Sequence, residues 1–278
     1  MIGALVGDIV GSRFEWNNIK QKEFELFTEN SQATDDSMMT IAIAAAILEA
    51  GDDMDILSQC AIKWMRKIGR SEPARGYGGG FRRWLLSSDP KPYNSWGNGA
   101  PMRVSPCAYV SDVLEEVLET SDRVTEVTHN HPEGMKGARA TTEAIFLARM
   151  GKSKEEIRKA MEVYYNLDFT LDEIRDTYSF DESSQGTVPQ AIEAFLESTD
   201  FEDAIRNAIS IGGDSDTLAA ITGSIAEAFY GVGGEFRKEV YKRFDEELIK
   251  VIEEFETKYE RYKTEIKLAN TKNYTVKK

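Results

Sequence analysis

The sequence of 278 residues contains only two cysteines, Cys60 and Cys107, and only two histidines, His129 and His131. Two cysteines in largely apolar surroundings argue against a disulfide framework and against a metal site made of thiolates. A zinc site on the two histidines is disfavoured because no cysteine or third histidine is available to complete it. We therefore expect a reducing, cytoplasmic location.

The sequence also lacks long apolar runs and an excess of basic residues. No stretch approaches the ~20 apolar residues that span a membrane. The first residues lack the basic start of a signal peptide, and Asp8 interrupts their apolar run. With 48 acidic and 34 basic residues, the formal net charge is −14. We expect no membrane association and no general affinity for nucleic acid, although one site could still take an anionic ligand through bound cations.

What the sequence does contain is helical periodicity, with apolar residues three and four positions apart. Alternating strand patterns, repeats, low-complexity linkers and a clear domain boundary are absent. The sequence therefore predicts one all-α domain over residues 1–266, followed by a polar C-terminal tail at 267–278. The segments with helical character are 1–10, 38–48, 112–127, 136–150, 154–165, 188–196, 201–211, 218–230 and 235–266. In the last of them, an apolar stripe from Val240 to Phe255 is expected to cover the core.

Glycines recur every fourth residue in the first predicted helix, at Gly3, Gly7 and Gly11. This spacing favours close packing against another helix in a crowded interior. Asp8 lies in the same apolar face, where a buried carboxylate needs a partner or a metal. Glu15 follows near the end of this helix.

Two acidic sets each open an apolar helix, and the second follows the glycine pair Gly212–Gly213. A single such side chain would serve only as a helix N-cap. Neighbouring carboxylates repel one another, however, and a cation between them relieves that repulsion most directly. Six oxygen-bearing side chains are enough for one hard cation and suggest two. They are Thr34, Asp35, Asp36, Asp214, Asp216 and Thr217.

Two loops between the acidic sets, 73–80 and 96–103, have too many glycines for helix interiors. Their backbone amides suit a phosphate or a sugar, and Tyr77 or Trp96 could stack on a base. As plain turns, the same loops would only connect helices. A third polar loop, 127–134, holds both histidines.

Five motifs in a fixed order span most of the chain. They are Gly7–Ser12 with Glu15, Thr34–Ser37, Gly97–Arg103, Thr128–His129 and Gly212–Thr217. With these motifs the sequence resembles the ADP-ribosylglycohydrolase family, which includes the dinitrogenase reductase activating glycohydrolase and the ADP-ribosyl-acceptor hydrolases. The resemblance implies a compact, orthogonal multi-helix domain with two divalent cations, magnesium or manganese, in a central cleft.

The resemblance also implies roles for particular residues. The metal ligands would be the six members of the two acidic sets, and the catalytic residues would be Glu15, Asp35 and Asp36. The residues that bind ADP-ribose would be Ser95, Trp96, Gly97, Asn98, Gly99 and His129. Trp96 stands where a close relative type has tyrosine, so stacking is retained. The loop after Glu15 is shorter than in larger members of the family, so the acceptor preference stays open.

We expect a hydrolase that cleaves the N- or O-glycosidic bond between ADP-ribose and an acceptor such as a protein side chain. The cations would bind the ribose hydroxyls while Asp35, Asp36 or Glu15 takes a proton from the attacking water. Two alternatives remain: a metal-dependent nucleotide phosphohydrolase and a non-catalytic ADP-ribose-binding module. We expect a monomer whose partner is an ADP-ribosylated substrate.

Overall fold

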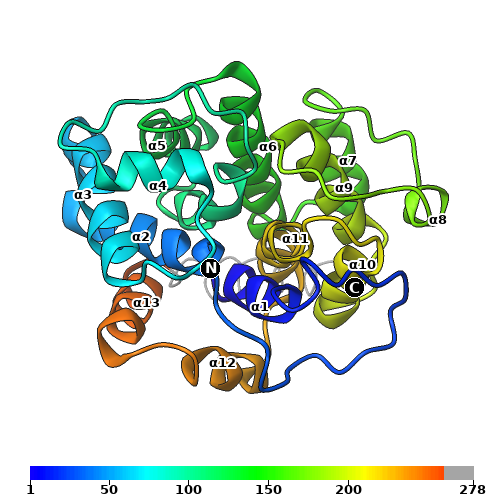
Figure 1. Ribbon diagram of the computed structural model, residues 1–278. Helices are drawn as coiled ribbons and strands as arrows, with labels where there is room; N and C mark the ends of the chain where they lie inside the picture. Colours follow the sequence, from blue (N-terminus) through cyan, green and yellow to red (C-terminus); the bar gives the residue numbers. More distant parts are fainter. Residues whose placement is uncertain (260–278) are drawn as a thin grey trace.

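The computed structural model describes residues 1–259, and every regular element in that range is helical (Figure 1). The α-helices are α1 (Ile2–Gly11), α2 (Asp35–Ala50), α3 (Met54–Ser71), α4 (Gly79–Leu86), α5 (Leu114–Thr125), α6 (Pro132–Arg149), α7 (Lys154–Met161), α8 (Leu171–Ile174), α9 (Ser184–Leu196), α10 (Phe201–Ser210), α11 (Ser215–Tyr230), α12 (Gly234–Tyr241) and α13 (Glu246–Tyr259). Two 3₁₀ turns, η1 (Pro101–Arg103) and η2 (Ser105–Tyr109), separate α4 from α5. The prediction of an all-α fold is confirmed.

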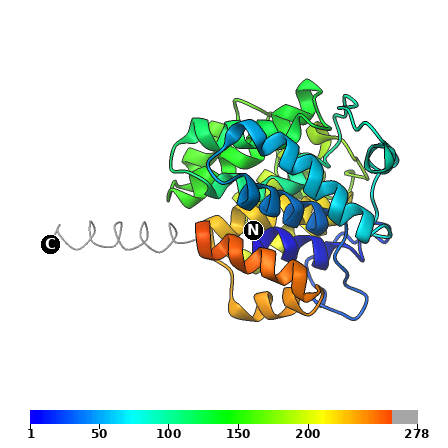
Figure 2. The ribbon, with the colours of Figure 1, turned by 90° about the vertical axis from the view of Figure 1, so that its left-hand side faces the viewer.

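Helices α1 and α11 lie side by side at the centre of the molecule (Figure 1). All residues of α1 and nearly all residues of α11 are buried, because α11 also packs against α6, α9 and α10. A helix that is apolar all round is stable only in such an interior position. Helix α2 contacts α1 on the other side and is itself covered by α3 and α13 (Figure 2).

Glycines allow the backbones of α1 and α11 to touch. A Cβ atom added to Gly7 would overlap the carbonyl group of Ala219, and one added to Gly3 would overlap that of Gly223. At Gly11 the added atom would come within 2.5 Å of the Cα atom of Asp216. The prediction that these glycines serve close helix packing is confirmed, and the contact holds the end of α1 against the start of α11.

The predicted segment 235–266 is two helices rather than one continuous stretch. Helix α12 ends at Tyr241, and Asp245 then starts α13 by accepting a hydrogen bond from the backbone N–H of Leu248 at 2.9 Å. Most of the apolar stripe is nevertheless buried: Val240, Leu248, Ile252 and Phe255 lie in the core, and Phe244 and Val251 pack against it while partly exposed. Residues 260–266 and the predicted tail at 267–278 lie outside the described residues.

The predicted loop at 73–80 is too long at its C-terminal end, because α4 already begins at Gly79. Gly79 and Gly80 form the first turn of α4, after Gly78 at the N-cap, and the helix is fixed by the buried rings of Phe81 and Trp84. Glycine costs least at a helix end, where tertiary packing can override its low propensity. Helix α3 was not predicted at all. None of the helices in residues 1–259 combines the length and the hydropathy of a membrane span.

We predict that Gly7→Ala lowers the free energy of unfolding by about 3 kcal/mol, because the added methyl group meets backbone that no rotamer change can move. Urea denaturation measures the change. Gly234→Ala is the matched control, since a Cβ there meets open space, and its effect should stay below ~1 kcal/mol. Equal effects of the two substitutions would contradict the packing argument.

Candidate metal and ligand site

A cavity of about 520 Å³ opens where the ends of α1, α2 and α11 meet. One wall is acidic, and the opposite wall is the loop 95–99 together with His129. Among the predicted site residues, only Thr34 does not line the cavity. The others are Glu15, Asp35, Asp36, Ser95, Trp96, Gly97, Asn98, Gly99, His129, Asp214, Asp216 and Thr217.

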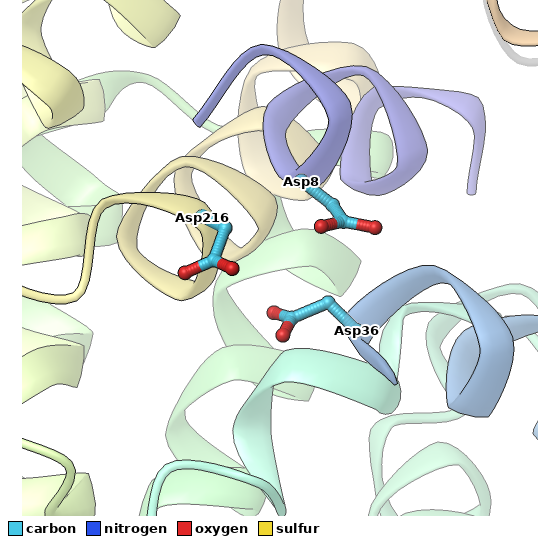
Figure 3. A group of neighbouring side chains, drawn as sticks. All are labelled: Asp8, Asp36 and Asp216. Atoms are coloured by element: carbon cyan, nitrogen blue, oxygen red, sulfur yellow. The ribbon is translucent and has the colours of Figure 1, made fainter. Parts of the chain in front are cut away.

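Two overlapping groups of carboxylates form the acidic wall. Asp8, Asp36 and Asp216 point toward one another from three different helices, with one oxygen of each within 4.8 Å of the others (Figure 3). Glu15 and Asp214 form a second group of the same size with Asp216, which the two groups share. Asp35 lines the cavity but belongs to neither group. The arrangement offers two neighbouring places where a cation could sit.

The carboxylates of this wall hold their protons more tightly than usual. Burial is the main cause, followed for most of them by the neighbouring negative charges. The pKa of Glu15 is raised to about 7 and that of Asp35 to about 8, while the pKa values of Asp36 and Asp216 lie well above the ordinary range. A divalent cation would remove this cost by pairing with the ionised groups.

The donor set fits such a cation. The Oδ1 atom of Asp36 is buried without a hydrogen-bond partner, although buried carboxylate oxygens are normally satisfied. All neighbouring groups offer oxygen, the atom that magnesium and manganese prefer. Thr217 contributes a hydroxyl that donates to the Oδ2 atom of Asp36 at 3.3 Å.

Asp8 is the residue that the sequence prediction left without a role. Its carboxylate accepts hydrogen bonds from the backbone N–H of Thr34 at 2.9 Å, the hydroxyl of Thr34 at 2.6 Å and the backbone N–H of Ser37 at 3.1 Å, and also from the Ser37 hydroxyl. Asp8 thereby fixes the start of α2, which carries Asp36. Its position in the apolar face of α1 was the signal that could have revealed it.

Thr34 lies behind the acidic wall rather than in it. Its hydroxyl donates to Asp8 and accepts from the backbone N–H of Asp36 at 3.3 Å, so Thr34 caps α2. Asp214 differs, because it occupies the N-cap position of α11 without a side-chain capping bond. Its Oδ2 atom instead accepts a hydrogen bond from the amide of Asn98 at 2.7 Å. The simple capping interpretation therefore holds for Thr34 but not for Asp214.

Asn98 connects the two walls of the cavity. Besides donating to Asp214, its side-chain amide donates to the hydroxyl of Thr187 at 3.1 Å. Both amide protons are thus used within the protein, and the side chain is 7% exposed. The Asn98 side chain positions the loop and Asp214 together.

A second connection joins Glu15 to the start of α11. The side-chain amide of Asn18 donates to the carbonyl groups of Glu15 and Gly213, at 3.0 and 2.9 Å, and its oxygen accepts from the N–H of Gly213 at 2.8 Å. Gly212 and Gly213 have φ angles of +70° and +78°, which favour glycine. The loop after α1 is therefore tied to the turn that presents Asp214.

Aromatic rings form the rim of the cavity. Trp16 and Phe180 stack with their centroids 5.0 Å apart, and both remain exposed, as does Trp96, which also lines the cavity. Tyr77, predicted as an alternative to Trp96 for stacking, is buried against Phe81 and does not line the cavity. Of the two residues, only Trp96 is available to a ligand.

The two histidines have separate surroundings. His131 caps α6, where its Nδ1 atom accepts from the backbone N–H of Glu133 at 3.1 Å. His129 is buried against the loop 95–99, and burial holds its pKa well below the usual range. Neither histidine is in a group of metal-ligating side chains within residues 1–259.

The sequence and the fold are similar to those of known proteins. The model of a family described as ADP-ribosylglycohydrolase matches residues 1–265. The chain is 25% identical to the ADP-ribosylhydrolase ARH3 of Homo sapiens over 84% of both chains. It is 26% identical to the ADP-ribosylarginine hydrolase Tri1 of Serratia proteamaculans, over 83% of this chain and 70% of the relative.

Two further comparisons agree. The ADP-ribosyl-[dinitrogen reductase] glycohydrolase of Rhodospirillum rubrum is 25% identical over 72% of this chain and 70% of its own. A solved structure titled ADP-ribosylglycohydrolase-related protein complex superimposes with a TM-score of 0.65 at 24% identity, covering 90% of this chain and 94% of the other. The solved structure supports the fold.

We predict that the metal-free protein loses stability as the pH rises from roughly 5 to 8. Over this range the folded carboxylates with raised pKa values, such as Asp35 at about 8, still bind protons that the unfolded chain has lost. The free energy of unfolding therefore falls with pH, and every ~1.4 kcal/mol lost lowers Tm by about 2–4 °C. Thermal melting at several pH values in the presence of a chelator measures this fall in Tm. Added Mg²⁺ or Mn²⁺ should restore Tm at the upper pH.

Asp36→Asn should flatten this pH dependence, because it removes one of the groups that repel one another. The exposed residue Asp52 provides the matched control, and Asp52→Asn should leave the dependence as it is in the wild type. A wild-type Tm that stays level or rises over this range would show that the cluster does not hold the extra protons.

Proposed function

Because the chain belongs to the ADP-ribosylglycohydrolase family, a family of hydrolases, we propose that it cleaves the glycosidic bond between ADP-ribose and an acceptor with two divalent cations, magnesium or manganese. One observation carries the proposal. Acidic side chains from three distant segments meet in one buried wall, facing a glycine-rich loop across a cavity. Two carboxylate groups that share Asp216 support two cations rather than one.

The proposed metal ligands are those of the sequence prediction. Asp8 and Glu15 complete the two carboxylate groups, but we assign Asp8 to holding the start of α2 and Glu15 to proton transfer. Bound to the proposed ligands, the cations would neutralise the acidic wall and hold the ribose hydroxyls in place. Five of the six residues line the cavity, and Thr34 is the least favoured because its hydroxyl is engaged by Asp8 and by the start of α2. The set is Thr34, Asp35, Asp36, Asp214, Asp216 and Thr217.

Glu15 is the best placed general base. It lies partly exposed at the cavity edge with a pKa near 7, so at neutral pH it can take a proton from water and later return it. Asp35 also lines the cavity and has a pKa of about 8, and Asp36 lies deeper. We assign the proton transfer to Glu15 and keep Asp35 and Asp36 as the alternatives.

The loop on the opposite wall would bind ADP-ribose. The backbone N–H of Gly99 is available to a phosphate oxygen, whereas that of Gly97 already donates to the Ser95 hydroxyl at 3.2 Å. The exposed ring of Trp96 offers a stacking surface for the adenine. Ser95, Asn98 and His129 complete this wall.

We place the acceptor beside the stacked rings of Trp16 and Phe180, which adjoin Glu15 at the rim. The relatives described above include a hydrolase named for ADP-ribosylarginine and a glycohydrolase named for ADP-ribosyl-[dinitrogen reductase]. The acceptor of this chain is therefore to be found by testing ADP-ribosylated proteins and peptides. A monomeric state and a cytoplasmic location complete the proposal, the latter because Cys60 and Cys107 are both free thiols.

The deciding experiment is product analysis with ADP-ribosylated arginine and serine peptides, with and without Mg²⁺ or Mn²⁺. We predict metal-dependent release of free ADP-ribose. Asp216→Asn should lower the rate about a thousandfold, since metal ions stabilise such transition states by several kcal/mol. The fold should persist because the substitution removes a repelling charge.

The exposed Asp52→Asn variant is the control and should keep the wild-type rate. Release of AMP and ribose 5-phosphate from ADP-ribose would instead indicate a nucleotide phosphohydrolase. Tight binding of ADP-ribose with no turnover of any substrate would indicate a binding module.

For Glu15→Gln we predict that kcat falls by about 10²–10⁴-fold while the affinity for ADP-ribose stays within about twofold, because only proton transfer is removed. Steady-state kinetics and calorimetric titration separate the two effects. Glu23→Gln, an exposed substitution in the following loop, is the control. An unchanged kcat would assign the base to Asp35 or Asp36.

A further inference from the structure

A buried chain of hydrogen bonds lies next to the loop 95–99, which we call the ligand loop. The Nη2 atom of Arg103 donates to the Oγ1 atom of Thr128 at 2.7 Å, and that atom lies 2.8 Å from the Nδ1 atom of His129. The three residues are 1%, 0% and 4% exposed, so water cannot replace these contacts. The direction of each bond therefore follows from the groups themselves.

The proton of the Thr128 hydroxyl has only one free acceptor. A guanidinium group can only donate, so the Thr128 oxygen accepts from Arg103. Its own proton could go to the Nδ1 atom of His129 or to the carbonyl oxygen of Thr125, which is 3.4 Å away. That carbonyl already accepts from the backbone N–H groups of Thr128 and His129, at 3.1 and 2.9 Å, which occupies both its lone pairs.

The hydroxyl proton must then point at the Nδ1 atom, which accepts it and carries no proton of its own. In a neutral imidazole the proton is then on Nε2. We infer that Thr128, oriented by Arg103, is a positioning residue that fixes His129 as the Nε2-protonated tautomer, a neutral hydrogen-bond donor facing the ligand.

The Nε2 atom is aimed at the ligand loop. A Cβ atom added to Gly99 would lie 3.2 Å from it, and one added to Gly97 would lie 3.8 Å from it. His129 lines the same cavity, and no group among residues 1–259 accepts a hydrogen bond from Nε2. The imidazole stays neutral because burial, and next the charge of Arg103, hold its pKa well below the usual range.

A fixed donor selects for an acceptor in the ligand. If the proposed function holds, the partner of Nε2 is an oxygen of the diphosphate or of a ribose. A hydroxyl that must donate, or an amide N–H group, would meet the imidazole proton and be disfavoured. The pair of Gly97 and Gly99 leaves the room that this contact needs.

The tautomer can be observed without any ligand. Nitrogen-15 NMR of the histidine side chains distinguishes Nε2–H, Nδ1–H and imidazolium forms, and the chain has only two histidines to assign. His129→Gln identifies the signal by its loss. We expect the Nε2–H form for His129 in the wild type, whereas an Nδ1–H or imidazolium signal overturns the inference.

Two matched variants test the role of Thr128. Thr128→Val keeps the shape and removes the hydroxyl, so His129 should lose its single tautomer and the affinity for ADP-ribose should fall about tenfold. Thr125→Val is the control: it removes a buried hydroxyl that has no hydrogen-bond partner and should change neither measurement. Thr128→Ser, which keeps the hydroxyl, should restore both.

Retention of the wild-type tautomer and affinity in Thr128→Val overturns the inference, as does an equal loss in Thr125→Val. If Thr128→Val does not fold, the wild-type spectrum and Thr128→Ser still decide. The proposed function fails separately, when wild-type protein with Mg²⁺ or Mn²⁺ does not bind ADP-ribose at all, because the tautomer is read without ligand.

Discussion

The mutual repulsion of carboxylates buried in one wall is the constraint on which the rest of the structure depends. Burial raises the pKa of Asp8, Asp36 and Asp216, and neighbouring negative charges raise the pKa of Asp36 and Asp216 further, so a fold that only minimised its energy would separate them. They stay together because the helices that carry them cannot move apart. Glycines in α1 allow its backbone to pack directly against that of α11. Asp8 holds the start of α2 by accepting four hydrogen bonds from it. The starts of α2 and α11 also direct their positive dipole ends toward the acidic wall.

The opposite wall is rigid for a different reason. There several polar groups are held by partners within the protein: the Asn98 amide by Asp214 and Thr187, and Arg103 in part by Thr128. A ligand therefore meets donors and acceptors whose directions are already set, so little side-chain freedom is lost on binding. Stability given up at the acidic wall is offset by the large apolar core around α11, in keeping with the usual trade between function and stability.

Much of this could be predicted from the sequence because the signals are local. Periodicity located most of the helices, and nearly all of the site residues identified from the two acidic sets and the ordered motifs line the cavity. What could not be predicted depends on partners far along the chain. The sequence predicts Thr34 as a metal ligand, but its hydroxyl donates a hydrogen bond to Asp8, which lies 26 positions earlier in the chain. Tyr77 has the chemistry of a stacking residue, yet it lies just before α4 and its ring is buried against Phe81 of that helix.

The hydrogen bond from Asn98 to Asp214 has a thermodynamic consequence. A cation that takes Asp214 as a ligand competes with the amide of the ligand loop for the same carboxylate. If the proposed function holds, occupancy of the two walls would be coupled. Such coupling is reciprocal: the factor by which the cation changes the affinity for the nucleotide is also the factor by which the nucleotide changes the affinity for the cation. The fraction of protein with substrate bound would then depend on the metal concentration as well as on the substrate concentration.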